Sequence, residues 1–238
     1  MSFSDWFQLS MPGEQLFSMM LRGLGETIYM TVASTLFAYL LGLPMGVILV
    51  TTAPNGLMPN HRVYRALNAI TNKAFNAITN IVRSVPFLIL LIFIIPFTRA
   101  IVGSSLGMNA TIVPLVISAS PMIARMVESS LKEVDGGVIE AAVSMGASKG
   151  LIVRRVMLKE ALPSLVDGVA ISMTTILGYS AMAGATGGGG LGSIAINYGY
   201  LRYQKDVMFI TIVLLIVIVQ IFQWLGSHIS RSIDRRRR

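Results

Sequence analysis

The residues with the most suggestive types and spacing form a short stretch between hydrophobic segments, Glu140-Ala-Ala-Val-Ser-Met-Gly146. A basic run follows this stretch and ends at Leu162-Pro163. An acidic residue, two small residues and then a glycine favour a short exposed helix with a defined end, because glycine commonly ends helices. Such an element suits noncovalent contact better than covalent chemistry. We therefore interpret this stretch as a loop that a separate protein could grip.

Groups suited to catalysis or metal binding are few and scattered. The chain has no cysteine, and its two histidines, His61 and His228, lie far apart. Glu128, Glu133 and Glu140 are separated by expected helix ends and glycines, so they form no acid–base pair. No G-x-x-x-x-G-K-[ST] phosphate loop occurs, so any ATP must bind a partner. We expect no catalytic residue, no metal and no cofactor.

Two glycine patterns also occur. Segment 187–192 formally satisfies G-x-G-x-x-G, but no strand precedes it, which argues against a dinucleotide site. We expect its glycines to let an outer loop turn sharply and pack closely against a docked protein or a second copy of the chain. Gly42-Leu-Pro-Met-Gly46 matches the G-x-x-x-G pattern of helix contacts, although Pro44 in its middle weakens that interpretation.

Composition indicates an integral membrane protein. Hydrophobic residues make up 54% and charged residues 13% of the 238 residues, and the mean hydropathy is +0.70. Soluble domains carry about 25% charged residues. The net charge of +8 does not indicate nucleic acid, because the basic residues mostly flank apolar segments. No basic segment precedes a short apolar run at the N-terminus, so we expect no cleavable signal peptide.

Five segments are apolar enough to cross a bilayer, which takes about 20 helical residues. We therefore predict an all-α fold with about five transmembrane helices, near residues 26–50, 79–102, 109–127, 164–186 and 207–225. The second and third segments contain prolines, which predict kinks that neighbouring helices tolerate in a membrane. These prolines are Pro86, Pro96, Pro114 and Pro121.

The basic residues predict an orientation. An N-terminus outside places fifteen of the nineteen on the inner face, which is the side that positive charge favours. The outer face keeps Arg22, Arg99, Arg202 and Lys205. The inner face receives Arg62, Arg65, Lys73, Arg83, Arg125, Lys132, Lys149, Arg154, Arg155, Lys159, Arg231 and Arg235 to Arg238. The C-terminus and the Glu140 loop are therefore expected in the cytoplasm.

Within this loop the composition predicts a short helix over Val138–Met145, a turn at Gly146 and a second helix over Ser148–Ala161. A helix held across the inner face by short connections could act as a lever on the spans at either side. The residues alone leave an alternative open, in which an amphipathic helix rests on anionic headgroups through its basic side chains. Those side chains are Arg154, Arg155 and Lys159.

The loop resembles the EAA loop of the permease subunits of bacterial ATP-binding-cassette (ABC) importers. Glu140-Ala-Ala and Gly146 match in spacing, and Val156 and Leu158 occupy the later apolar positions. Lys159 stands where the family has proline, and Pro163 follows four residues on, so the end of the coupling helix differs from the family pattern. The resemblance implies that the loop docks on an ATPase subunit.

The resemblance also implies roles for individual residues. Glu140 would make a polar contact with the ATPase, and Ala141 and Ala142 would allow close approach. Tyr179 and Met182 match positions that line the translocation path or its gate, where either side chain could seal a constriction. Ordinary packing between helices explains these two residues equally well.

Further segments resemble the methionine-uptake branch of these permeases, and together they cover roughly residues 26–228. The implied assembly contains a second copy of the chain, two cytoplasmic ABC ATPase subunits and an extracytoplasmic methionine-binding protein, within the lipid of the bacterial inner membrane. The segments are Arg83–Leu88, Ile95–Arg99, Pro121–Glu128, Gly178–Met182, Gly188–Gly192 and Tyr198–Tyr200.

We divide the chain into three parts. Residues 1–23 form an extracytoplasmic segment that mixes aromatic and acidic residues, which suits either a segment along the membrane surface or a partly ordered tail. Residues 24–228 form the ABC-importer transmembrane domain, with the coupling loop at 135–162. Residues 229–238 form a basic cytoplasmic tail.

We therefore predict a multi-pass permease subunit that moves methionine by alternating access and is not itself an enzyme. Permeation of another amino acid is one alternative. An ion-coupled secondary transporter is another, and it predicts ionisable residues in mid-membrane and inverted repeats, neither of which the sequence shows. A passive channel would not need the elaborate inner loop.

Overall fold

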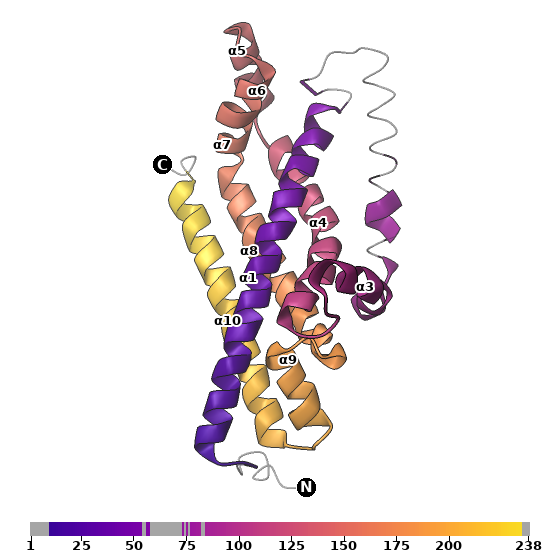
Figure 1. The fold of residues 1–238 in the computed structure, drawn as a ribbon. Helices are drawn as coiled ribbons and strands as arrows, with labels where there is room; N and C mark the ends of the chain where they lie inside the picture. Colours follow the sequence, from indigo (N-terminus) through magenta and orange to yellow (C-terminus); the bar gives the residue numbers. More distant parts are fainter. Residues whose placement is uncertain are drawn as a thin grey trace. The chain divides into compact units, whose positions relative to one another are not determined.

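The structure is a computed structural model that describes residues 10–53, 56–57, 73, 75, 77–81 and 84–234. Throughout these residues the regular elements are helices (Figure 1). This confirms the predicted all-α class. The arginines at positions 62, 65, 83 and 235–238, which we predicted on the inner face, lie outside the described residues. The predicted orientation of the chain stays a prediction.

Four helices are long and apolar enough to cross a membrane, and a fifth apolar helix is shorter. The five correspond in order to the five predicted spans. They are α1 (Gly13–Thr51), α3 (Phe87–Val102), α4 (Met108–Lys132), α8 (Leu162–Ala183), which continues into the 3₁₀ turn η3 (Gly184–Thr186), and α10 (Lys205–Ile233).

The predicted second span, residues 79–102, is not one continuous helix. Pro86 is the N-cap of α3, with φ −54° and ψ 133°, so it precedes the helix and does not kink it. The physical reason is that proline has no N–H to donate and disfavours helical geometry in the residue before it. Pro96 does lie inside α3, as expected.

Helix α1 extends further toward the N-terminus than predicted. It begins at Gly13 and runs through the expected boundary between residues 23 and 24 without a break. Much of the segment that we expected to lie along the membrane surface is therefore continuous with the first transmembrane helix. Residues 1–9 lie outside the described part of the chain.

The chain forms two compact units, each assembled from parts of several helices. The first unit contains the described parts of residues 1–36, 85–117 and 173–224. The second contains those of residues 37–84, 118–172 and 225–238.

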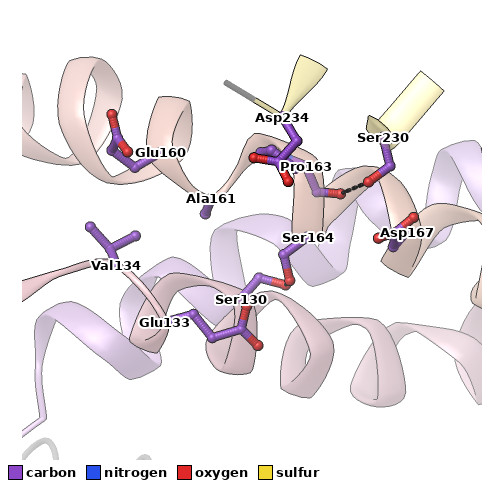
Figure 2. Close-up of a pocket in the computed structure, with 10 residues that line it drawn as sticks. All are labelled: Ser130, Glu133, Val134, Glu160, Ala161, Pro163, Ser164, Asp167, Ser230 and Asp234. Carbon is purple, nitrogen blue, oxygen red and sulfur yellow. Dashed lines mark hydrogen bonds between the residues drawn. The ribbon is translucent and has the colours of Figure 1, made fainter. Parts of the chain in front are cut away.

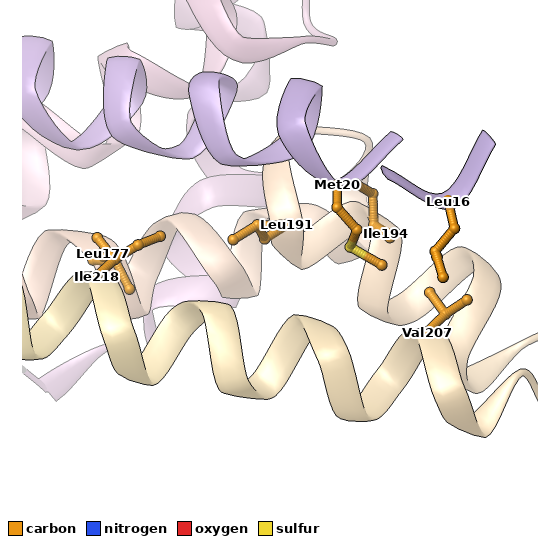
Figure 3. Packing of buried hydrophobic residues seen from close by; sticks show 7 residues of the cluster. All are labelled: Leu16, Met20, Leu177, Leu191, Ile194, Val207 and Ile218. Atoms are coloured by element: carbon orange, nitrogen blue, oxygen red, sulfur yellow. The ribbon is translucent and has the colours of Figure 1, made fainter. Parts of the chain in front are cut away.

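The first unit has a core of aliphatic side chains from four helices (Figure 3). Leu191 and Val207 are fully buried in it. Burying one such side chain stabilises a fold in water by about 1.5–3 kcal/mol, whereas against lipid the gain comes from close packing. The core consists of Leu16 and Met20 of α1, Leu177 of α8, Leu191 and Ile194 of α9 (Gly190–Ile194), and Val207 and Ile218 of α10.

The glycine-rich segment of the first unit packs against this chain's own helices. Gly187, Gly189 and Gly190 have φ values of +80°, +86° and +72°, which glycine adopts without strain. The Gly190 N–H donates to Glu26 Oε2 at 2.8 Å, and the Leu191 N–H donates to Thr27 Oγ1 at 2.8 Å. The predicted sharp turn is therefore present, and the close approach that these glycines permit is made to α1.

In the second unit, two glycines of α1 face α4. A Cβ atom added to Gly42 would lie 2.7 Å from Ile123 Cγ2, and one added to Gly46 would lie 2.6 Å from Val127 Cβ. Small residues let membrane helices approach closely, and the G-x-x-x-G interpretation is confirmed. Pro44 does not prevent the contact, because α1 continues through it.

Gly46→Ala is expected to destabilise the protein by about 1–3 kcal/mol, because the new methyl group overlaps α4 and forces a shift. The overlap includes backbone, since the added Cβ would lie 2.7 Å from the carbonyl oxygen of Ala124. Thermal unfolding of the purified protein in detergent measures the effect.

Gly25→Ala is the matched control, because Gly25 lies in the same helix and its added Cβ meets nothing within 4 Å. This change should leave the stability unchanged or raise it by up to about 1 kcal/mol. Equal effects of the two changes would contradict the proposed contact between α1 and α4.

Candidate functional site

The Glu-Ala-Ala stretch lies in α5 (Gly136–Ser144), a short helix of the second unit. Asp135 is its N-cap, and the carboxylate of Asp135 accepts a hydrogen bond from the Gly137 N–H at 2.7 Å. Aspartate is among the strongest N-caps, because its side chain satisfies an amide that the helix leaves unpaired. The helix therefore begins two residues before the predicted Val138.

The end of α5 explains the spacing between Glu140 and Gly146. The Ala147 N–H donates to the Ala142 carbonyl at 3.1 Å, and the Gly146 N–H donates to the Val143 carbonyl at 2.9 Å. Gly146 has φ +76°, so this arrangement is a Schellman motif with glycine in the left-handed position. The predicted turn at Gly146 is confirmed.

The predicted coupling residues do not all face the same way. Glu140 and Ala141 are exposed, whereas Ala142 is only 5% exposed and packs against its own chain. Of the two alanines, only Ala141 is available to a partner on this surface. The role of both alanines in close approach to an ATPase stays a prediction.

Large apolar side chains accompany Glu140 on the exposed surface of the loop. Met145 is 81% exposed and Val143 is 53% exposed, and Val138 and Leu151 are also exposed. An exposed group of apolar side chains in a polar surrounding is typical of a protein-contact surface. The sequence motif did not indicate these residues, although a run of apolar residues between Glu140 and Gly146 was a signal that could have found them.

The segment after Gly146 is less regular than the predicted single helix over Ser148–Ala161. It consists of α6 (Lys149–Leu151), the π-helix η2 (Ile152–Met157) and α7 (Leu158–Glu160). Ile152 and Met157 are buried, and α5 packs against η2. Arg154, Arg155 and Lys159 are exposed, so the structure leaves their contact with lipid headgroups open.

The two candidate gate residues differ in their surroundings within the first unit. The Tyr179 ring stacks on Phe87 of α3, with ring centroids 4.5 Å apart and planes 7° from parallel. Met182 is 52% exposed. The stack gives Tyr179 a packing role, and a role of either residue in the path stays a prediction.

The carboxylates of the described residues do not form a metal centre. No group of three or more metal-binding side chains was found within these residues. Glu128 of α4 is paired with cations, because Lys132 Nζ lies 2.7 Å from Glu128 Oε1 and Arg125 also contacts this carboxylate. Arg125 in turn lies over the Phe75 ring, 5.3 Å from its centroid.

Comparison with known proteins decides the family. The family model described as "binding-protein-dependent transport system inner membrane component" matches residues 42–235. The chain belongs to this family. Membership confirms the predicted class of ABC-importer permease and its location in the bacterial inner membrane. The match includes α5 and the segments on either side of it.

Relatives of named function cover most of the chain. A probable D-methionine transport system permease protein MetI from Vibrio cholerae is 45% identical over 235 residues, which is 99% of this chain and 98% of the relative. The D-methionine transport system permease protein MetI from Escherichia coli K12 is 48% identical over 171 residues, 72% of this chain and 75% of the relative.

Solved structures agree with these relatives. A chain of the MetNI methionine ABC transporter in an inward-facing conformation has a TM-score of 0.85 and 46% identity, and the match covers 94% of this chain and 100% of the other. A chain of an amino acid ABC transporter, solved with histidines, has a TM-score of 0.66 and 18% identity over 92% of this chain and 94% of that chain. The second match supports the fold alone.

Gly146→Ala is expected to destabilise the end of α5 by about 1 kcal/mol, because a β-carbon disfavours the left-handed conformation. An added Cβ at Gly146 meets nothing within 4 Å, so the backbone alone causes the effect. Faster hydrogen exchange of the amides at positions 145–147 measures the loss.

Gly150→Ala is the control, since Gly150 lies in α6 and its added Cβ also meets nothing within 4 Å. Alanine is favoured over glycine in a helix, so this change should slow exchange or leave it unchanged. Faster exchange in both variants would mean that the conformation of Gly146 is not the cause.

Proposed function

We propose that the chain is the membrane-spanning subunit of an ABC importer that carries methionine into the cell, with ATP hydrolysed on a separate subunit. The observation that supports the substrate most strongly is the 45% identity, over 99% of this chain, to a relative named as a D-methionine permease. The similar solved chain belongs to a methionine ABC transporter, which supports the same substrate. Permeation of another amino acid is the main alternative.

Helix α5 is, in this proposal, the element that the ATPase subunit holds. Met145 and Val143 would enter an apolar groove of the partner, while Glu140 would meet a donor at its edge. Ala141 lets the partner approach the helix backbone, and buried Ala142 fixes α5 to its own chain. Exposed apolar anchors beside one carboxylate give both affinity and a fixed orientation.

Transport would proceed by alternating access. Closure of the ATPase subunits around ATP would displace α5, open the path outward and admit methionine, and hydrolysis would return the path to the inside. Moving a two-state equilibrium from mostly one state to mostly the other takes about 5.5 kcal/mol of differential interaction. The path and its gate, to which Tyr179 and Met182 are assigned by resemblance, must then change shape.

The proposed assembly contains two copies of this chain, two cytoplasmic ABC ATPase subunits and an extracytoplasmic methionine-binding protein. Residues 24–228 form the transmembrane domain, residues 135–162 its coupling loop, residues 1–23 the outer segment and residues 229–238 the cytoplasmic tail. An N-terminus outside and a C-terminus inside place α5 where a cytoplasmic ATPase can reach it. Surrounding lipid completes the assembly.

An ion-coupled secondary transporter is the rival from another class. It predicts a carboxylate in a membrane helix that can gain and lose a proton or bind a cation. Glu128 of α4 does not suit that role, because Arg125 and Lys132 already neutralise it. This pairing argues against Glu128 as an ion-coupling residue.

Glu140→Ala is expected to weaken binding of the ATPase subunit about tenfold or more, because a hydrogen bond to a charged group contributes about 1.5–3 kcal/mol. The dissociation constant of the purified subunits measures this. Glu14→Ala is the matched control, because Glu14 is an exposed acidic residue in the first turn of α1. This change should leave binding of the ATPase subunit unchanged. Unchanged binding in the Glu140 variant would contradict the coupling role.

Vesicles that contain the chain, its ATPase subunit and the methionine-binding protein should accumulate labelled methionine only when ATP is supplied. Both enantiomers and a polar amino acid are tested as competitors, and only methionine is expected to compete. Competition by the polar amino acid alone would favour the alternative in which the chain carries an amino acid other than methionine. Uptake that continues without ATP and stops with an uncoupler would favour the ion-coupled mechanism.

A further inference from the structure

A polar cavity of about 280 Å³ lies beside the junction of α7 and α8 in the second unit (Figure 2). Glu160 and Ala161 line it from before the junction, and Pro163 and Ser164 line it from the first turn of α8. The remaining walls come from the C-terminal ends of α4 and α10 and from the residues beside them. These are Ser130, Glu133, Val134, Ser230 and Asp234, together with Asp167 of α8.

The junction itself is a weak point in the helix. α7 ends at Glu160, and α8 begins at Leu162 after the single turn residue Ala161. Pro163 has no N–H, so it donates no hydrogen bond to the turn before it. Ala161 itself donates to the Met157 carbonyl and accepts from the Leu165 N–H, both at 2.9 Å. The arm that contains α5, η2 and α7 thus joins α8 through one turn residue, next to a position that can donate no backbone hydrogen bond.

Two side-chain hydrogen bonds hold the α8 side of this bend. The hydroxyl oxygens of Ser130 in α4 and Ser164 in α8 are 2.9 Å apart. The Ser230 hydroxyl of α10 donates to the Pro163 carbonyl oxygen at 3.0 Å, as Figure 2 shows. Ser130 and Ser230 are each only 5% exposed, so water competes little for these bonds. The first turn of α8 is thus tied to α4 and to α10.

The cavity gives the junction room to move. Four carboxylates, those of Glu133, Glu160, Asp167 and Asp234, line it. The open volume therefore lets the angle at the junction change without overlap between packed side chains.

We propose that residues 161–164 form the hinge through which movement of α5 reaches the membrane helices, with Ser130 and Ser230 as positioning residues. This inference rests on the proposed function of α5. Movement of α5 reaches the junction through η2, which α5 contacts, and α7. Because the first turn of α8 is tied to α4 and α10, the ends of all three helices then move together.

The main test replaces both serines, S130A/S230A, and measures methionine transported per ATP hydrolysed in vesicles with the ATPase subunit and binding protein. Assembly and ATP hydrolysis should persist, while the ratio should fall at least fivefold. S130T/S230T keeps both hydroxyl groups and should restore most of the ratio. Ser84→Ala is the control, since the Ser84 hydroxyl donates to the nearby Asn80 carbonyl of its own segment.

The outcomes separate the two proposals. An unchanged ratio in S130A/S230A would overturn the hinge and leave the proposed function intact. Failure of the unaltered chain to bind any ATPase subunit would overturn the proposed function and, with it, the hinge. Loss of folding in S130A/S230A would leave the decision to a second variant.

That second variant is S130C/S164C, which is available because the chain has no cysteine of its own. Side chains whose terminal oxygens are 2.9 Å apart lie within disulfide reach. Copper phenanthroline with oxygen would oxidise the two thiols to a disulfide, accepting two electrons while two protons leave. With the disulfide between α4 and α8 formed, the amount of methionine transported per ATP hydrolysed should stay as high as in the unaltered chain. A block of transport that dithiothreitol reverses would overturn the hinge.

Discussion

Close contact between helices at small residues is the constraint on which the rest of this structure depends. Inside a bilayer, every backbone polar group must be satisfied within the protein, and a helix achieves this within a single segment. Lipid is as apolar as leucine, and burial from water therefore contributes little to holding those helices together. Gly42 and Gly46 let α1 touch α4, and a Cβ added to Gly226 of α10 would touch Ala170 of α8. The contacts in the second unit hold in place the helix ends from which α5 projects.

Helix α5 combines a fixed base with an exposed face. Asp135 begins it, Gly146 ends it, and Ala142 packs inward, so its position is set by the chain itself. Met145 and Glu140 are exposed. A rigid helix with an unsatisfied outer face is what the transfer of motion between two proteins requires. A flexible α5 would deform under the partner and absorb the displacement itself.

The features that sequence reasoning predicted correctly are those set by local chemistry. Apolar stretches of sufficient length predicted five helices, and Gly146 predicted the end of α5, because a left-handed residue favours glycine wherever it occurs. The inward direction of Ala142 and the π-helix at Ile152–Met157 were missed. Both depend on what packs against the loop, which a single sequence does not reveal. Pro86 was misplaced because a proline can precede a helix or bend one, and the sequence is compatible with both.

The same distinction applies to the site. The Glu-Ala-Ala motif and its spacing indicated the helix that we propose as the docking element, while the hydroxyl pair of Ser130 and Ser164 gave no signal. These serines are thirty-four residues apart and meet only in the folded chain. The stacking of Tyr179 on Phe87 was likewise invisible. Local sequence patterns therefore located α5, whereas tertiary contacts determine how α5 is held against the rest of its unit.

The length of α1 exceeds what crossing a bilayer requires. Its 39 residues span about 58 Å at 1.5 Å per residue, against about 40–45 Å for a whole bilayer with its headgroups. Tilting to fit would take an angle of about 40°, at the limit of what transmembrane helices adopt. At least one end of α1 therefore extends beyond the headgroups into water, where molecules that never enter the membrane can reach it.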